Sequence, residues 1–161
     1  MSKFYRIVES LLKSVNRIEN KSKNNKLKIA YRSAIYNTSS KNDLIFSIHK
    51  KINYILKNNE EISKQIFING EFDFRVLKKG LKFLNNKKKF LINIGSHVGT
   101  TLIPALKENL FEECIAFEPS KNNFRLLTAN IYINKLDEKV RAYHLALSNK
   151  ISSGYLQLFH S

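Results

Sequence analysis

Cysteine and tryptophan are almost missing from this sequence of 161 residues, which contains one cysteine and no tryptophan. A lone Cys114 can form neither an intramolecular disulfide nor a zinc site built from several cysteines. The four histidines show no metal-ligand spacing with one another or with this cysteine, so the sequence supports no metal site. With no disulfide to form, the chain is expected to work in a reducing cytoplasm.

Long apolar runs are missing as well. No run approaches the roughly 18 residues that a membrane-spanning helix needs. The first residues also lack the uninterrupted apolar core of a signal peptide. Neither a membrane span nor a secretion signal is therefore expected.

Acidic residues are scarce, since 13 of them accompany 28 lysines and arginines and leave a formal net charge of +15. Such an excess can attract a nucleic acid or an anionic membrane. Only six of the basic residues are arginines, however, and arginine is the residue that best fits phosphates and base edges. We therefore favour a solvated basic surface, with a non-enzymatic module that binds nucleic acid as the alternative.

Residues 1–70 are expected to form a helical N-terminal region. An amphipathic helix is indicated over residues 3–19 by an apolar stripe, which consists of Phe4, Ile7, Val8, Leu11, Leu12, Val15 and Ile18. We favour packing of this stripe against the following domain. Basic residues beside it leave peripheral contact with an anionic membrane surface as the alternative. Residues 20–27 then read as a polar linker.

Three further elements are predicted before residue 88. Apolar residues over 44–56 suggest a second amphipathic helix. Asn69-Gly70 between two alternating apolar stretches is the signal of a tight β-hairpin. Asp73 is a good N-cap for a third helix, which ends near residue 85 despite Gly80 in its middle.

After residue 88, three apolar runs of strand length alternate with helical segments. The runs are "KFLINIG", "ECIAFEP" and "KVRAYHLALS", and "GYLQLFHS" is a candidate fourth strand. Helices are expected from Thr101 to Leu110 and from an N-cap at Ser120 onward. The first run is almost continuously apolar, which suits a strand covered on both faces. This alternation predicts a right-handed, doubly wound parallel α/β sheet over residues 71–161.

Two glycines separate the first strand from its helix in the stretch "FLINIGSHVGT". Gly95 lets the chain turn, and Gly99 permits either close packing of helix and strand or contact between a ligand and the backbone. Glu118 follows the second strand, 23 residues after Gly95 (118 − 95), which is near the spacing at which an acid bonds ribose hydroxyls in nucleotide-binding folds. Glu118 could instead cap the next helix. Taken together with the glycine turn, Glu118 is more simply interpreted as a residue that binds ribose.

The sequence of this turn distinguishes between two classes of cofactor, dinucleotides and S-adenosylmethionine. A dinucleotide site needs the pattern Gly-x-Gly-x-x-Gly to hold a pyrophosphate, and Ser96 and His97 follow Gly95 with no glycine in that place. The ligand is therefore expected to lack a pyrophosphate, as S-adenosylmethionine does. His97 is a candidate catalytic base, although a histidine in a turn is more commonly a hydrogen-bonding turn residue.

Three motifs together resemble the FkbM family of S-adenosylmethionine-dependent methyltransferases. They are "FLINIGSHVGT", "IAFEPSKNNFRLLTANIYIN" and "VRAYHLALSNKISSGYLQL". The family pattern is Asp-Ile-Gly-Ala-Asn-x-Gly after a strand, then Ala-Phe-Glu-Pro, a helix with an Asn-x-x-x-Asn tail, and Ala-Leu-Ser. The likeness covers residues 88–161 and implies a Rossmann-like class I methyltransferase sheet.

The resemblance also implies a set of cofactor-binding residues. Gly95, Ser96 and Gly99 would contact the amino-acid end of the cofactor. Glu118 would hold the ribose, Pro119 would fix its turn, and Ala146 and Leu147 would lie near the adenine. Asn93 stands where the family has Asp, so a carboxylate near the cofactor's ammonium group is lost and an amide oxygen takes its place. His97 stands where the family has Asn.

An incomplete sheet follows from the same resemblance. A full sheet of this class has more strands than residues 88–161 can supply, so three or four are expected, with the first at an open edge. We therefore expect a truncated member, whose acceptor pocket and any catalytic base lie beyond Ser161 and whose own activity is open. The implied reaction is methyl transfer to a hydroxyl of a sugar, a glycan or another small metabolite.

Overall fold

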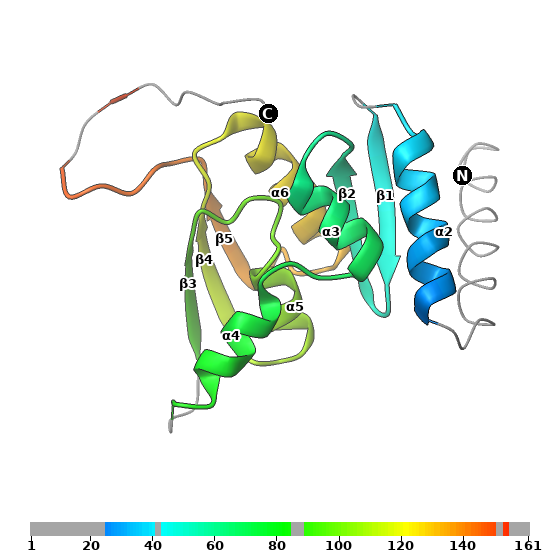
Figure 1. Cartoon of the computed structure of the whole chain (residues 1–161). Coiled ribbons are helices and arrows are strands. Elements are labelled where there is room, and N and C mark those ends of the chain that lie inside the picture. The colour runs from blue at the N-terminus through cyan, green and yellow to red at the C-terminus, as the bar shows by residue number, and fades with distance from the viewer. Residues whose placement is uncertain (1–24, 41–42, 85–88, 151–152, 155–161) are drawn as a thin grey trace, which may run out of the picture.

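The structure is a computed structural model that describes residues 25–40, 43–84, 89–150, 153 and 154 (Figure 1). The predicted helix over residues 3–19 and most of the predicted fourth strand lie outside these residues. The described elements are α2 (Asn25–Thr38), β1 (Leu44–His49), β2 (Ile52–Lys57), α3 (Glu61–Asn69), α4 (Phe74–Leu81), β3 (Phe90–Ile94), α5 (Leu102–Lys107), β4 (Glu113–Phe117), α6 (Lys121–Ile133) and β5 (Val140–Tyr143).

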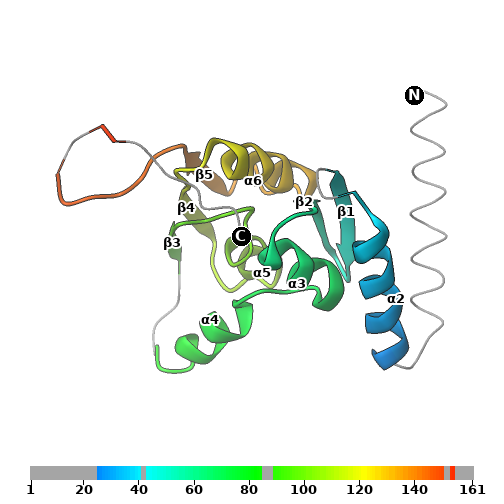
Figure 2. The same cartoon turned by 45° about the horizontal axis from the view of Figure 1, so that its top comes forward.

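Two sheets lie on opposite sides of the molecule, with α5 and α6 between them (Figures 1 and 2). β1 and β2 form an antiparallel hairpin in which Leu44 is opposite Lys57 and His49 is opposite Ile52. β3, β4 and β5 form a parallel sheet in the order β3-β4-β5. The parallel sheet and its crossover helices confirm the predicted α/β class.

Residues 44–57 form the hairpin, so the predicted second helix is wrong. Tyr54 and Leu56 are buried at alternate positions of β2, as a strand with one covered face requires. The helical spacing of the apolar residues does not decide the structure here, because a turn at Lys50, whose φ is 55°, divides the segment into two short strands. The isoleucines of both strands are β-branched and favour the extended conformation.

Gly70 ends a helix, so the hairpin predicted at Asn69-Gly70 is also wrong. Gly70 has a φ of 84° and donates its N–H to the Ile66 carbonyl at 2.8 Å, which closes the last turn of α3. An Asn-Gly pair supplies a residue of positive φ, and a helix C-cap needs such a residue as much as a tight hairpin does. A Cβ at position 70 would also lie 2.5 Å from the His49 ring.

The helix α4 confirms the third predicted helix. Asp73 occupies its N-cap position with a φ of 57°, and its side chain makes no capping hydrogen bond. Gly80 lies inside the helix near its end. Beyond the backbone of the helix itself, no atom in the described part of the chain lies within 4 Å of the position that a Cβ on Gly80 would take.

Gly80→Ala is expected to raise the free energy of unfolding by about 0.5–1 kcal/mol, because alanine loses less conformational entropy than glycine in a helix. Urea unfolding followed by circular dichroism measures the change. Gly154→Ala is the matched control, since its surroundings are equally open but it lies outside any described helix or strand. A loss of stability in Gly80→Ala would contradict the helical assignment.

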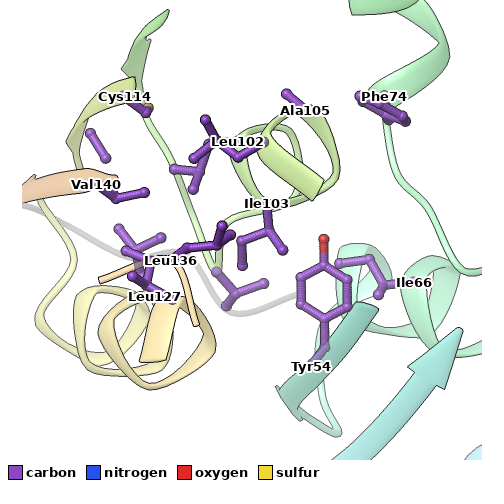
Figure 3. Packing of buried hydrophobic residues seen from close by; sticks show 14 of the residues in the cluster. Tyr54, Ile66, Phe74, Leu102, Ile103, Ala105, Cys114, Leu127, Leu136 and Val140 are labelled. Carbon is purple, nitrogen blue, oxygen red and sulfur yellow. The ribbon is translucent and has the colours of Figure 1, made fainter. Parts of the chain in front are cut away.

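One face of the parallel sheet is buried and the other is exposed. Cys114 and Val140 lie on the face that α5 and α6 cover, within the core shown in Figure 3. Burial raises the pKa of the Cys114 thiol to about 12, so the thiol stays protonated at neutral pH. On the other face, Phe90, Ile92 and Ile94 of β3 are 46%, 61% and 63% exposed. Within the described residues, the predicted cover on both faces is therefore wrong, whereas the predicted open edge at β3 is confirmed.

The two crossover helices, α5 and α6, lie where the sequence predicts them. Ser120 caps α6, and its side chain accepts a hydrogen bond from the Asn123 N–H at 3.4 Å. Leu127 and Ile131 bury one face of this helix. The helix α5 is shorter than predicted, and Pro104 occupies its first turn, where no intrahelical N–H donor is lost.

Asn130 of α6 and Asn134 at its C-cap join this helix to the hairpin. Asn130 accepts from the Ile55 N–H at 2.6 Å and donates to the Ile55 carbonyl at 3.1 Å. Asn134 makes the same two bonds with Asn53, at 3.0 and 2.6 Å. These side-chain amides bond to β2 on the edge away from β1, as a third strand would, so they satisfy its backbone groups and block pairing with another chain.

Candidate functional site

The turn after β3 is fixed to the end of β4, at the edge of the sheet where parallel strands present their carboxyl ends. The N–H groups of Gly95 and Ser96 both donate to the Phe117 carbonyl at 2.9 Å. Ser96 is buried, and its hydroxyl donates to the Asn93 carbonyl at 2.9 Å. In parallel α/β sheets this edge is where ligands bind.

The two glycines of the turn have different surroundings, although both have positive φ values, 73° at Gly95 and 92° at Gly99. A Cβ on Gly99 would lie 2.5 Å from the Ile103 Cδ1 and 3.3 Å from the Leu127 Cδ1. Packing of the turn against α5 and α6 therefore requires Gly99. Apart from its chain neighbours, no atom of the described residues lies within 4 Å of the corresponding Cβ position at Gly95, so Gly95 borders space that a ligand could occupy.

Glu118 lies at the same edge of the sheet as the glycine turn and contacts it directly. The residue is only 5% exposed. Its Oε2 accepts from the His97 N–H at 2.7 Å, and its Oε1 accepts from the Ser120 N–H at 2.9 Å. The carboxylate thus bonds to the start of α6, as the capping interpretation requires, and joins the ends of β3 and β4, as the ribose interpretation requires.

His97 contacts Glu60, an acid that was not predicted as a site residue. Its Nε2 lies 3.1 Å from the Glu60 Oε2, and its Nδ1 is buried with no hydrogen-bond partner among the described residues. The φ of His97 is 51°, a left-handed conformation that asparagine and histidine tolerate better than most residues. A histidine at this position is therefore compatible with the conformation of the turn.

The end of β5 reaches the same edge through His144. The His144 Nε2 lies 3.0 Å from the Pro119 carbonyl, and the ring stacks on Phe124 with centroids 5.2 Å apart. Ala146 and Leu147 follow in an exposed, irregular segment and are not part of the buried cluster. The predicted residues that the structure brings together are Asn93, Gly95, Ser96, His97, Gly99, Glu118 and Pro119.

Two further residues contact the glycine turn and were not predicted as site residues. Tyr54 donates its hydroxyl to the Gly99 carbonyl at 3.4 Å, and burial raises its pKa far above the usual range, so the hydroxyl remains a donor. Asn130 donates to the Val98 carbonyl at 3.0 Å. Only Asn130 has a sequence signal, because it belongs to the Asn-x-x-x-Asn motif.

A separate open hollow lies between α2, the hairpin, α3 and residues 68–76. Its lining carries charges of both signs, and none of the predicted cofactor residues belongs to it. Arg32, which lines it, is buried and donates to the Ile48 carbonyl at 2.9 Å and to the Phe67 carbonyl. The Arg32 guanidinium therefore holds α2 to the hairpin and α3, and the hollow is distinct from the strand-end cluster.

The described residues contain no group of three or more His, Cys, Asp or Glu side chains that could hold a metal ion. No helix among them is long and apolar enough to cross a bilayer. The side-chain chemistry at the strand ends is that of carboxylates, amides, a hydroxyl and an imidazole.

The chain resembles known proteins in structure over part of its length, but not in sequence. No family model matches it, and no curated protein matches it by sequence. It is similar to P. horikoshii TYW2 in complex with MeSAdo, at 19% identity and a TM-score of 0.49, over 67% of this chain and 38% of that one. It is similar to M. jannaschii TYW2 in complex with AdoMet, at 19% identity and a TM-score of 0.48, over 67% and 45%. It is also similar to the SAM dependent methyltransferase from Agrobacterium tumefaciens, at 10% identity and a TM-score of 0.45, over 67% and 34%.

The chain spans less than half the length of these three structures, namely 38%, 45% and 34%. Likenesses at these identities and TM-scores assign no activity. The FkbM resemblance is not confirmed, since no family model matches. What the chain binds must therefore be argued from the residues at the strand ends.

Proposed function

We propose that the strand ends of this chain bind S-adenosylmethionine and that the chain is the cofactor-binding part of a methyltransferase. One observation carries the proposal: the Glu118 carboxylate lies 2.7 Å from the His97 N–H. An acid at the end of one strand therefore touches the glycine turn at the end of its neighbour. This is the place in a parallel α/β sheet where an acid accepts hydrogen bonds from a ribose.

The residues present fit the polar groups of such a ligand. A carboxylate has about four lone-pair sites, and the His97 and Ser120 N–H groups use two of those on Glu118. Sites remain for the ribose hydroxyls. Gly95 borders open space, and the Asn93 Oδ1 is buried with no hydrogen-bond partner among the described residues.

S-adenosylmethionine, when bound, supplies a methyl group that its sulfonium already activates. The protein then has to bind and orient the reactants and keep water out. His97 uses its Nε2 to contact Glu60 and buries its Nδ1, so we assign it to positioning the turn rather than to proton transfer. The acceptor that we propose from the FkbM resemblance is a hydroxyl of a sugar, a glycan or another small metabolite.

S-adenosylmethionine and its demethylated product, S-adenosylhomocysteine, are expected to bind the chain and to raise its melting temperature, because each binds only the folded state. Isothermal titration calorimetry measures the binding directly, without requiring turnover. NAD is the control ligand and is expected not to bind, since the turn lacks the dinucleotide pattern. No heat from either adenosyl ligand at millimolar concentration would refute the proposal.

Glu118→Gln should weaken the binding of both adenosyl ligands about tenfold or more, because the ribose hydroxyls lose a charged acceptor and one of its two oxygens becomes a donor NH2 group. Glu138→Gln is the matched control, since Glu138 is exposed and follows α6 at its far end. Melting temperatures of the free variants show whether each one is folded at the temperature of the titration.

A further inference from the structure

An acid from the N-terminal half of the chain reaches the proposed cofactor site. Glu60 precedes α3, and its Oε2 lies 3.1 Å from the His97 Nε2 in the glycine turn. The main chain of Glu60 is held in place, because its carbonyl accepts from the Tyr36 hydroxyl at 3.1 Å and from the Lys64 N–H at 3.0 Å. Burial raises the pKa of Tyr36, so that hydroxyl remains a donor.

Two carboxylates therefore flank one residue of the turn. Glu118 accepts from the backbone N–H of His97, and Glu60 contacts the imidazole of the same residue. The chain as a whole carries a net charge of +15, so this negative charge is local and opposite in sign to its surroundings. A pair of acids in this setting favours a ligand with a positive charge.

Buried polar atoms without partners lie on the elements that flank this contact. Among the described residues they include the Ser63 Oγ, the Asn93 Oδ1 and the His97 Nδ1. Ser63 is on the first turn of α3, three residues after Glu60, and Asn93 is two residues before the first glycine of the turn. Proteins pair nearly all of their buried polar atoms, so unpaired ones on the segments around one acid indicate a place for a polar ligand.

S-adenosylmethionine has the complementary charge, because its sulfonium and ammonium outweigh its single carboxylate. The position that holds an acid in the FkbM pattern is Asn93 in this chain. We propose that Glu60 binds the ammonium group of the cofactor and so supplies the charge that Asn93 lacks. This inference rests on the proposed function. On binding, the Glu60 carboxylate accepts from the ammonium group and keeps its contact with the His97 imidazole, since a carboxylate has about four lone-pair sites. No covalent bond changes.

The test compares two ligands that share adenosine and differ in the amino-acid end. Glu60→Gln is expected to weaken S-adenosylhomocysteine binding about 10- to 100-fold, the factor for one hydrogen bond to a charged group. Binding of 5′-methylthioadenosine, which has no ammonium group, is expected to stay unchanged. Glu61→Gln is the matched control, because Glu61 is the next residue and its carboxylate accepts from the exposed Gln65 amide.

Each outcome of these titrations decides the proposal. Equal weakening of both ligands would overturn it, because Glu60 would then act on the shape of the site rather than on the ammonium group. Unchanged binding of both ligands in Glu60→Gln would also overturn it. If the unmodified chain binds neither ligand, the proposed cofactor site itself fails, which is a separate and recognisable result.

Discussion

Asn130→Ala is expected to lower the free energy of unfolding by about 3–5 kcal/mol, because three backbone groups lose their partner and each unsatisfied group costs about 1–3 kcal/mol. The Asn130 amide bonds to the N–H and the carbonyl of Ile55 and to the carbonyl of Val98. The residue is fully buried, so water can reach these groups only if the structure opens. Urea unfolding followed by circular dichroism measures the loss.

The expected loss of stability is large because Asn130 bonds to two other elements from its own helix. It joins α6 to β2 of the hairpin and to the turn after β3. Asn122→Ala is the matched control, since Asn122 is exposed on the same helix and its replacement should leave stability almost unchanged. A loss below about 1 kcal/mol in Asn130→Ala, typical of a single exposed hydrogen bond, would mean that the hairpin is held by other contacts.

The parallel sheet could be predicted from the sequence because two of its three strands, β3 and β4, have clear ends. β3 ends just before Gly95, which has a positive φ, and β4 ends two residues before Pro119, which has no N–H to donate to a strand ladder. Their apolar runs also marked them as strands, although these runs wrongly predicted cover on both faces of the sheet. Local signals were therefore sufficient for the half of the chain that carries the candidate site.

The N-terminal elements could not be predicted in the same way, because their local signals fit two structures. The isoleucines between residues 44 and 56 recur at spacings of three and four, which indicate a helix, whereas their β-branched side chains favour strands. Gly70 offers a positive φ that suits a C-cap and a hairpin turn alike. In both cases packing against other elements decided between the alternatives, as the burial of Tyr54 against the turn after β3 illustrates.

The residues of the candidate site likewise fall into those that local sequence signals could predict and those that they could not. Gly95, Glu118 and Ser120 could be found because each lies at the end of a strand or the start of a helix, where residue type and position are tightly coupled. Glu60 could not, because it reaches His97 across 37 positions of sequence (97 − 60) and has no periodic or motif signal of its own. A contact of that kind exists only once the hairpin has placed α3 beside the glycine turn.

The two glycines of the turn are expected to respond in opposite ways to alanine. Gly99→Ala should lower the free energy of unfolding by about 2–4 kcal/mol, because overpacking costs about 1–3 kcal/mol and the left-handed backbone about 1–2 kcal/mol. The added Cβ would lie 2.5 Å from the Ile103 Cδ1. Gly95→Ala carries only the backbone cost of about 1–2 kcal/mol, since no atom lies near its Cβ position.

Ligand binding should show the reverse order, because only Gly95 borders open space. At a temperature where both variants are folded, Gly95→Ala is expected to abolish S-adenosylhomocysteine binding, whereas Gly99→Ala should bind it nearly as well as the unmodified chain. Calorimetric titration and urea unfolding of the same two samples give both quantities. Equal loss of binding in the two variants would show that the turn acts only as a rigid unit, and the assignment of Gly95 to ligand contact would then fail.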